Sequence, residues 1–122
     1  MPFSQRIDRA QGVIYTRAWG VLTDEDLSGI HAAMMAEPAY KPELTRLYDL
    51  SEVTDVPVSS RAILRQSLAT AEAPNARRAI VVPSDEAYGM ARMFAILSGR
   101  EGLIQVFRDR PSAVQWLNSA GG

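Results

Sequence analysis

The sequence predicts a single α/β domain over residues 1–122, in which a mixed sheet of about five strands is covered by about four helices. Three observations lead to this fold class. The chain opens with two segments of strand-like alternation, and residues 77–110 have the pattern of strand, helix and strand. Helical and strand-like periodicities alternate along the rest of the chain, so the expected element order is ββαβαβαβα. A chain of 122 residues also has the ordinary size of one domain.

The first two elements are predicted to form an antiparallel hairpin. Apolar and polar residues alternate over 3–7, as on an edge strand, and the alternation resumes over 13–21 after a turn at 9–12. Because successive side chains of a strand point to opposite faces, each segment can bury one face against the rest of the protein.

The first helix has a well-marked start. Thr23 suits its N-cap, and the acidic residues 24–26 fill the first turn, where the helix dipole favours negative charge. The helix is expected to end before Pro38, which cannot continue it. A strand over 44–50 follows, and the polar stretch 51–58 is predicted to be a loop.

The second and third helices are predicted to start at a serine at 59–60 and at Ser84, because serine side chains cap helices well. The apolar run 79–82 between them is typical of a strand covered on both faces. A strand over 103–107 and a last helix after Asp109 complete the chain. The predicted apolar face of the second helix consists of Ile63, Leu64, Leu68 and Ala71.

The third helix carries an apolar stripe besides the face that residues 90–94 turn to the sheet. A helix that is apolar on more than one side is usually covered by something else. Two interpretations are open: the flank contacts a second subunit, a protein partner or a ligand, or other parts of the same chain bury it. The candidate interface residues on this flank are Tyr88, Gly89, Arg92, Met93 and Ile96.

A group of polar residues near the end of the third predicted strand forms a second candidate site. Asp49 ends this strand, where ligand sites of α/β proteins often lie, and Ser51 and Thr54 follow it. These residues are candidates for a polar rim, and the two hydroxyl side chains are candidates for phosphorylation. Turn formation explains the same residue types without any function.

Several functional classes have no support in the sequence. The net charge is −1 and the basic residues are dispersed, so nucleic-acid binding is not expected. The chain has no cysteine and one histidine, His31, so neither a metal nor another cofactor is expected. No stretch has the apolar length of a membrane span or the pattern of a secretory leader. The absence of cysteine fits a reducing cytoplasm, which is the expected location.

Five short motifs occur in an informative order. They are GVLTDED at 20–26, LYDL at 47–50, AIVVP at 79–83, YGMARMF at 88–94 and VFRD at 106–109, and the YGMARMF motif is the most specific. With these motifs the whole chain resembles the SpoIIAA-like family of small bacterial proteins. That family is related in fold to STAS domains and has been compared with the lipid-binding Sec14 domain. The fold that the resemblance implies agrees with the element order predicted above.

The resemblance also implies a site. Anti-sigma-factor antagonists of the STAS type carry an Asp-Ser-Ser-Gly-like turn after an inner strand, and its first serine is phosphorylated. The corresponding residues here are Asp49, Leu50, Ser51 and Glu52. A leucine therefore stands at the phosphoacceptor position and the glycine is absent, so Ser51 is the residual candidate.

The sequence predicts a non-enzymatic, cytoplasmic interaction or regulatory module of STAS-like fold, acting through homodimerisation or binding of a protein partner. The alternative is a carrier of a small apolar ligand or lipid in a Sec14-like pocket, which requires an apolar cavity. A third interpretation is an enzyme that uses Asp49 and its polar neighbours as acid or base. No pairing of a nucleophile with a base supports it.

Overall fold

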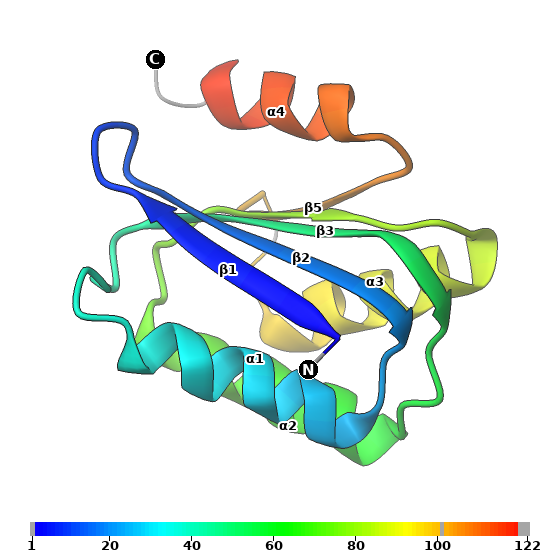
Figure 1. The fold of residues 1–122 in the computed structure, drawn as a ribbon. Helices are drawn as coiled ribbons and strands as arrows, with labels where there is room; N and C mark the ends of the chain where they lie inside the picture. Colours follow the sequence, from blue (N-terminus) through cyan, green and yellow to red (C-terminus); the bar gives the residue numbers. More distant parts are fainter. Residues whose placement is uncertain (1, 101, 120–122) are drawn as a thin grey trace.

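The computed structural model describes residues 2–100 and 102–119, which form a five-stranded sheet with helices on both faces (Figure 1). The elements are β1 (Phe3–Asp8), β2 (Val13–Val21), α1 (Asp24–Ala36), β3 (Thr45–Asp55), α2 (Ser60–Ala69), β4 (Arg78–Val81), α3 (Asp85–Ser98), β5 (Ile104–Phe107) and α4 (Arg110–Ser119). A short 3₁₀ helix, η1 (Thr70–Glu72), follows α2. The predicted α/β fold class and the order ββαβαβαβα are confirmed.

The strands lie side by side in sequence order, β1-β2-β3-β4-β5. β1 pairs antiparallel with β2, and the pairs from β2 to β5 are parallel. Each parallel pair is joined through α1, α2 or α3, and such crossovers share one hand. Because the crossovers also advance in one direction across the sheet, these three helices cover the same face. Figure 1 shows them below the sheet and α4 above it.

Side chains cap the helices where the sequence predicts helix starts. The Thr23 hydroxyl accepts from the backbone N–H of Asp26 at 3.2 Å, and the Asp26 carboxylate accepts from the backbone N–H of Thr23 at 3.0 Å. Ser59 and Ser84 each accept from the backbone N–H three residues on, at 3.0 and 3.2 Å. Asp109 does the same at the start of α4, at 2.8 Å. These bonds satisfy N–H groups that the helices themselves leave without a partner.

The loop predicted at 51–58 is wrong over most of its length, because β3 continues to Asp55. The long strand β2 pairs with β3 as far as Val21 opposite Asp55. β4 pairs with β3 only as far as Asp49 opposite Val81. The end of β3 therefore has a neighbouring strand on one side only, and polar residues are tolerated there. A polar sequence indicated a loop where the structure has a half-covered strand.

The predicted apolar face of α2 is also wrong. Ile63 is buried as expected, but Leu64 and Leu68 are 46% and 68% exposed, and Ala71 is exposed too. One turn after Ile63 the buried residue is Ser67, whose hydroxyl donates to the backbone carbonyl of Ile63 at 2.8 Å and lies 3.3 Å from the backbone carbonyl of Phe94 in α3. A small residue thus occupies the contact between the two helices, and the leucines are turned outward.

Candidate functional site

An apolar cavity of about 150 Å³ lies between the sheet and the layer formed by α1, α2 and α3. Leu27 and Ile30 of α1, Ile63 of α2, and Met90 and Phe94 of α3 line its walls. Side chains of β3 and β4 form its floor. An apolar cavity, which the carrier interpretation requires, is therefore present, and its role as a ligand site stays a prediction.

Small residues on α3 explain why this space is not filled. Ala87, Ala91 and Ala95 recur at intervals of one helical turn and are all buried. They turn toward the sheet, and Ala87 and Ala91 line the cavity. Protein interiors are close-packed, so a line of alanines beneath a helix leaves space unless larger side chains reach across. The larger side chains of Met90 and Phe94 flank the alanines and do not fill the space between the alanines and the sheet. Both are half-buried.

One end of the cavity is polar. Tyr48 of β3, His31 of α1 and Gln66 of α2 join the apolar lining. Tyr48 precedes Leu50 along β3, whereas His31 follows Leu27 along α1, and Gln66 follows the apolar lining of α2. Because α1 and α2 run opposite to the parallel strands, all three polar side chains lie toward the end of the sheet at which β3 and β4 begin.

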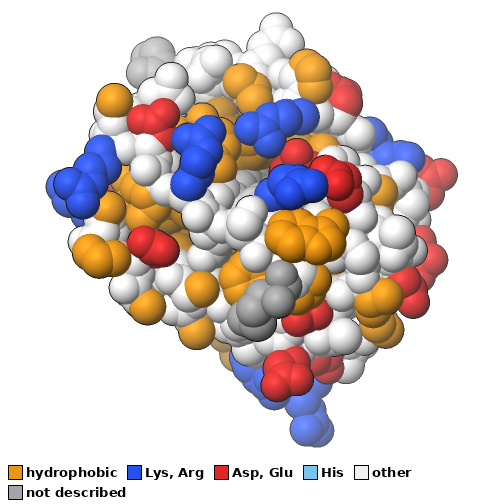
Figure 2. Space-filling view, in the orientation of Figure 1, with side chains coloured by type: hydrophobic (Ala, Val, Ile, Leu, Met, Phe, Trp, Pro, Cys, Tyr) orange, Lys and Arg blue, Asp and Glu red, His pale blue; other side chains and the backbone are white. Residues whose placement is uncertain are grey.

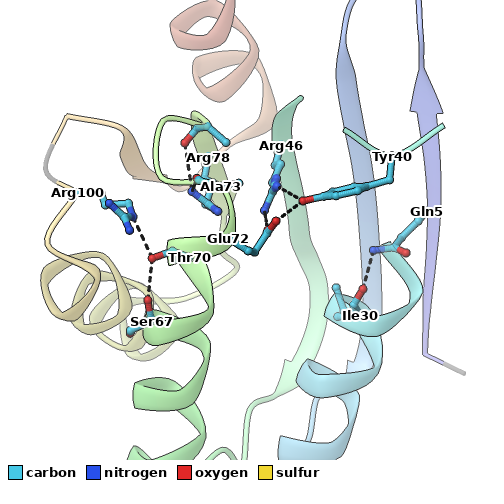
Figure 3. Close-up of polar contacts among 11 residues, drawn as sticks. Gln5, Ile30, Tyr40, Arg46, Ser67, Thr70, Glu72, Ala73, Arg78 and Arg100 are labelled. Carbon is cyan, nitrogen blue, oxygen red and sulfur yellow. Dashed lines mark hydrogen bonds and ion pairs between the residues drawn. The ribbon is translucent and has the colours of Figure 1, made fainter. Parts of the chain in front are cut away.

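Two arginines are buried at this end of the sheet, and Figure 3 shows their contacts. Arg46 and Arg78 are each 2% exposed and lie opposite one another on β3 and β4. The Arg46 guanidinium forms an ion pair with Glu72 at 3.0 Å and donates to the Tyr40 hydroxyl at 2.9 Å. That hydroxyl donates in turn to the second oxygen of Glu72. Arg78 donates to two backbone carbonyls at 3.2 and 3.3 Å, so Glu72 balances one of the two buried cations.

The pKa values in this cluster follow from burial and from these contacts. Burial lowers the pKa of Arg78, and the charge of Arg46 lowers it further. Burial would lower the pKa of Arg46 as well, but neighbouring tyrosines and Glu72 raise it. Burial would raise the pKa of Glu72, yet the hydrogen bonds from Tyr40 and Arg46 hold it below its usual value. Burial and the bond to Glu72 raise the pKa of Tyr40 to about 12. Burial lowers the pKa of His31, which favours a neutral imidazole.

The buried arginines were not among the residues predicted to form a site, although strand alternation indicates them. Arg46 stands two residues before Tyr48, and Arg78 stands two residues before Ile80. Residues two apart on a strand share a face, so each arginine lies on the same face as an inward-pointing aromatic or aliphatic side chain.

The flank of α3 that carries the candidate interface residues is exposed. We call it the α3 flank; it consists of Tyr88, Gly89, Arg92, Met93 and Ile96. All five residues are exposed, and a Cβ added at Gly89 would meet no atom within 4 Å. Residues 2–100 and 102–119 leave this flank uncovered, and its role as a contact surface stays a prediction.

Exposed apolar side chains extend from the α3 flank onto α2. Ser67 and Phe94 mark the contact between these helices. Leu68 directly follows Ser67, and Met93 directly precedes Phe94; both are exposed on the outer surface. Leu64, one turn before Leu68, continues the apolar surface. The sequence placed these leucines in the core, so this extension of the surface was not predicted.

The predicted polar rim does not lie at a strand end. Asp49 is inside β3, where its carboxylate accepts from Arg110 at 3.1 Å and from the Ser51 hydroxyl at 2.6 Å. Burial would raise the pKa of Asp49, but these partners lower it. Thr54 is exposed further along β3. Asp49 and Ser51 are thus brought together, whereas Thr54 takes no part in their contact.

The sheet surface that α4 leaves open is covered by arginine side chains. Arg6 lies over the Tyr15 ring at 4.3 Å from its centroid, and Arg17 lies over the Trp19 ring at 5.0 Å. Arg17 also forms an exposed ion pair with Glu52 at 2.8 Å. Figure 2 shows basic and hydrophobic side chains intermingled in this region. Cation–π contacts of this kind stabilise a surface without requiring a ligand.

Neither a metal cluster nor a membrane-spanning helix occurs in residues 2–100 and 102–119. Within that part of the chain, no three His, Asp or Glu side chains gather closely enough to hold a metal ion. Among the helices described, none is both long and apolar enough to cross a bilayer.

Comparison with known proteins supports the fold. No protein-family model matches this chain, and no curated protein sequence matches it either. An uncharacterized protein of the DUF3478 family with a SpoIIAA-like fold, from Shewanella loihica, is 23% identical with a TM-score of 0.63, over 94% of this chain and 93% of its own. The anti-sigma factor antagonist SpoIIAA in its unphosphorylated form is 13% identical with a TM-score of 0.60, over 95% of this chain and 97% of its own. The predicted resemblance is confirmed at the level of the fold, and the chain has a SpoIIAA-like, STAS-like α/β fold.

Proposed function

We propose that this protein is a non-enzymatic regulatory module that acts through protein contacts, and that it associates with a second copy through the α3 flank. The observation that carries the proposal is that the packed helices α3 and α2 both expose large apolar side chains, Met93 and Ile96 on α3 and Leu68 on α2. Contiguous apolar surface on a monomer usually marks a site of interaction. One of the similar structures is an anti-sigma factor antagonist, which also supports a function through protein contacts.

The charges along α3 favour a second copy as the partner. Glu86 and Arg92 lie three residues before and after Gly89. If two α3 helices cross in antiparallel orientation at Gly89, Glu86 of each copy lies opposite Arg92 of the other, as twofold symmetry requires. The missing side chain at Gly89 allows the two backbones to approach closely.

The test is the oligomeric state of native protein and of charged variants. We expect a dimer whose dissociation constant rises roughly tenfold or more in Met93→Glu and in Ile96→Glu, because each buries a carboxylate in the contact. Sedimentation velocity over a concentration series measures this.

Met35 provides a matched control on a different helix. It is 44% exposed on α1, whereas Met93 is 43% exposed on α3. Met35→Glu should associate as the native chain does. A native chain that is monomeric at every concentration, or Met93→Glu and Ile96→Glu variants that associate as well as Met35→Glu, contradicts the proposal.

A second function, carriage of a small apolar ligand, is favoured by the cavity under α1, α2 and α3. Its volume of about 150 Å³ is below the ~300–1,000 Å³ of sites for drug-sized molecules. We therefore propose a small molecule as the occupant, in preference to a membrane lipid.

Native mass spectrometry of protein purified from its own host tests this second function. Gentle conditions should give a reproducible added mass, and denaturing conditions should remove it. Ala91→Leu fills the cavity and should abolish the added mass without unfolding the protein. Protein that carries no added mass under gentle conditions, or an added mass that Ala91→Leu retains, contradicts it.

A further inference from the structure

We infer that the cavity binds a small monocarboxylate, a single carboxylate on an apolar body about the size of one benzene ring. Its carboxylate would lie at the end formed by His31, Tyr48 and Gln66. The inference rests on the second function proposed above and adds to it the chemical class of the ligand.

The size of the apolar body follows from the walls and the volume of the cavity. Leu27, Ile30, Ile63 and Phe94 present carbon atoms from three helices, and the volume is about 150 Å³. Cavities of about this volume lined by leucine, isoleucine and phenylalanine stay dry and take up benzene. A single ring or a short branched chain therefore fits, and a long acyl chain does not.

The polar end supplies hydrogen-bond donors. Tyr48 has a hydroxyl, Gln66 has an amide NH₂, and a neutral His31 has one ring N–H. Burial lowers the pKa of His31, so its imidazole is neutral near pH 7. These three lining residues come from two helices and a strand, and their donors together match the acceptor capacity of one carboxylate.

The charge behind this end is positive. Arg46 and Arg78 share the inner face of the sheet with Tyr48, which follows Arg46 by two residues on β3. Glu72 balances one of the two guanidinium groups, and Arg78 donates to neutral carbonyls. The Arg46 Nε has no hydrogen-bond partner in the described part of the chain. In a buried setting such an excess of positive charge favours an anion over a neutral or cationic group.

Benzoate and benzamide form a matched pair of probes for this inference. They share ring and shape, and near pH 7 only benzoate carries a charge. We expect benzoate to bind the native full-length chain about tenfold more tightly than benzamide, because charge-assisted hydrogen bonds are stronger than neutral ones. Titration calorimetry gives the two dissociation constants, and the NMR shifts of the Ile30 and Ile63 methyl groups locate the bound ring.

The outcomes separate the ligand class from the carrier function. Benzamide binding at these methyl groups as tightly as benzoate overturns the carboxylate assignment and leaves the carrier function standing. Failure of both probes to shift the methyl groups overturns both. Palmitate is the third probe. If palmitate shifts the same methyl groups and binds as tightly as benzoate, the proposed limit on the size of the ligand is wrong. Sedimentation velocity reports self-association independently of all three.

Substitutions at the polar end test the orientation of the ligand. Gln66→Leu and His31→Leu remove a donor and keep the bulk of a half-buried side chain. Each should bring the affinity for benzoate toward that for benzamide. Gln115→Leu, the same change at an exposed position of α4, should leave the ratio unchanged. A benzoate preference that persists in full in Gln66→Leu and His31→Leu contradicts the placement of the carboxylate.

Discussion

The two faces of the sheet differ both in how they pack and in what they show to solvent. Under α4, Ala79 and Val81 lie against Ala113, and all three side chains are fully buried. The outer surface of α4 carries polar residues. On the other face, three helices enclose a cavity of about 150 Å³, and Leu68 and Ile96 are exposed on their outer surface.

The same strands take part in both layers, so the difference arises from the covering helices. α4 places Trp116 over the sheet, where its ring packs at 5.8 Å from that of Phe107. α3 instead turns a line of alanines toward the strands. Both proposed functions therefore use the side of the sheet that α1, α2 and α3 cover. The side under α4 is close-packed and takes part in neither.

The largest effect that we expect concerns the ion pair between Arg46 and Glu72, near the polar end of the cavity. Glu72→Ala leaves the buried Arg46 guanidinium without its counter-ion and should lower the free energy of unfolding by about 3 kcal/mol. Glu52→Ala removes the partner of Arg17 on the other side of the sheet, where both side chains are about half exposed. The Glu52→Ala control should lower the free energy of unfolding by less than about 1 kcal/mol. Urea unfolding measures both, and equal losses would contradict the contrast.

The pH dependence of stability provides a second measurement on Glu72. Its pKa is lower in the folded chain than its ordinary value of 4.5. Its contribution is therefore fully present above that value and is lost as the pH falls through the lower folded pKa. Between about pH 6 and about pH 3, the urea midpoint of the native chain should fall more than that of Glu72→Gln. Parallel curves for the two proteins would show that Glu72 is not responsible.

The next effect compares the same substitution on the two faces. Ala79→Leu adds volume to the solid layer under α4 and should destabilise the protein by about 2 kcal/mol, because no space receives the larger side chain. Ala91→Leu adds the same volume to the cavity wall and should leave stability unchanged or raise it. Thermal unfolding decides between them. A loss in Ala91→Leu as large as that in Ala79→Leu would mean that the cavity cannot accept a side chain.

Sequence patterns predicted the order of elements and the helix starts, because caps and periodicity are local properties. They failed where tertiary packing decides between two assignments. On α2, Ile63 can share a buried face with Leu64 and Leu68 or with Ser67, and the second face is buried because the helix packs closely against α3. The polar residues 51–55 remain in a strand because β2 extends far enough to pair with them.

The candidate site was predictable in part. The α3 flank follows from helical spacing, and the buried Arg46 and Arg78 follow from strand alternation, although they were not singled out. The cavity was not predictable in the same way, since empty space depends on the summed volumes of side chains from several elements. No local pattern around Ala87 or Ala91 determines whether a neighbour reaches across to fill it.

The smallest effect that we expect concerns the outer surface of α3. Gly89→Ala should raise the stability of the monomer by about 1 kcal/mol, because glycine weakens a helix interior and the added methyl meets no atom. The same methyl group would separate two α3 helices that cross at this residue, so the variant should dimerise more weakly while unfolding at higher urea. Gly99→Ala is the control of opposite sign, since Gly99 ends α3 in the left-handed region at φ 66°. It should lose stability and keep the native dimerisation. A Gly89→Ala variant that is more stable and dimerises as well as the native chain would move the contact away from Gly89.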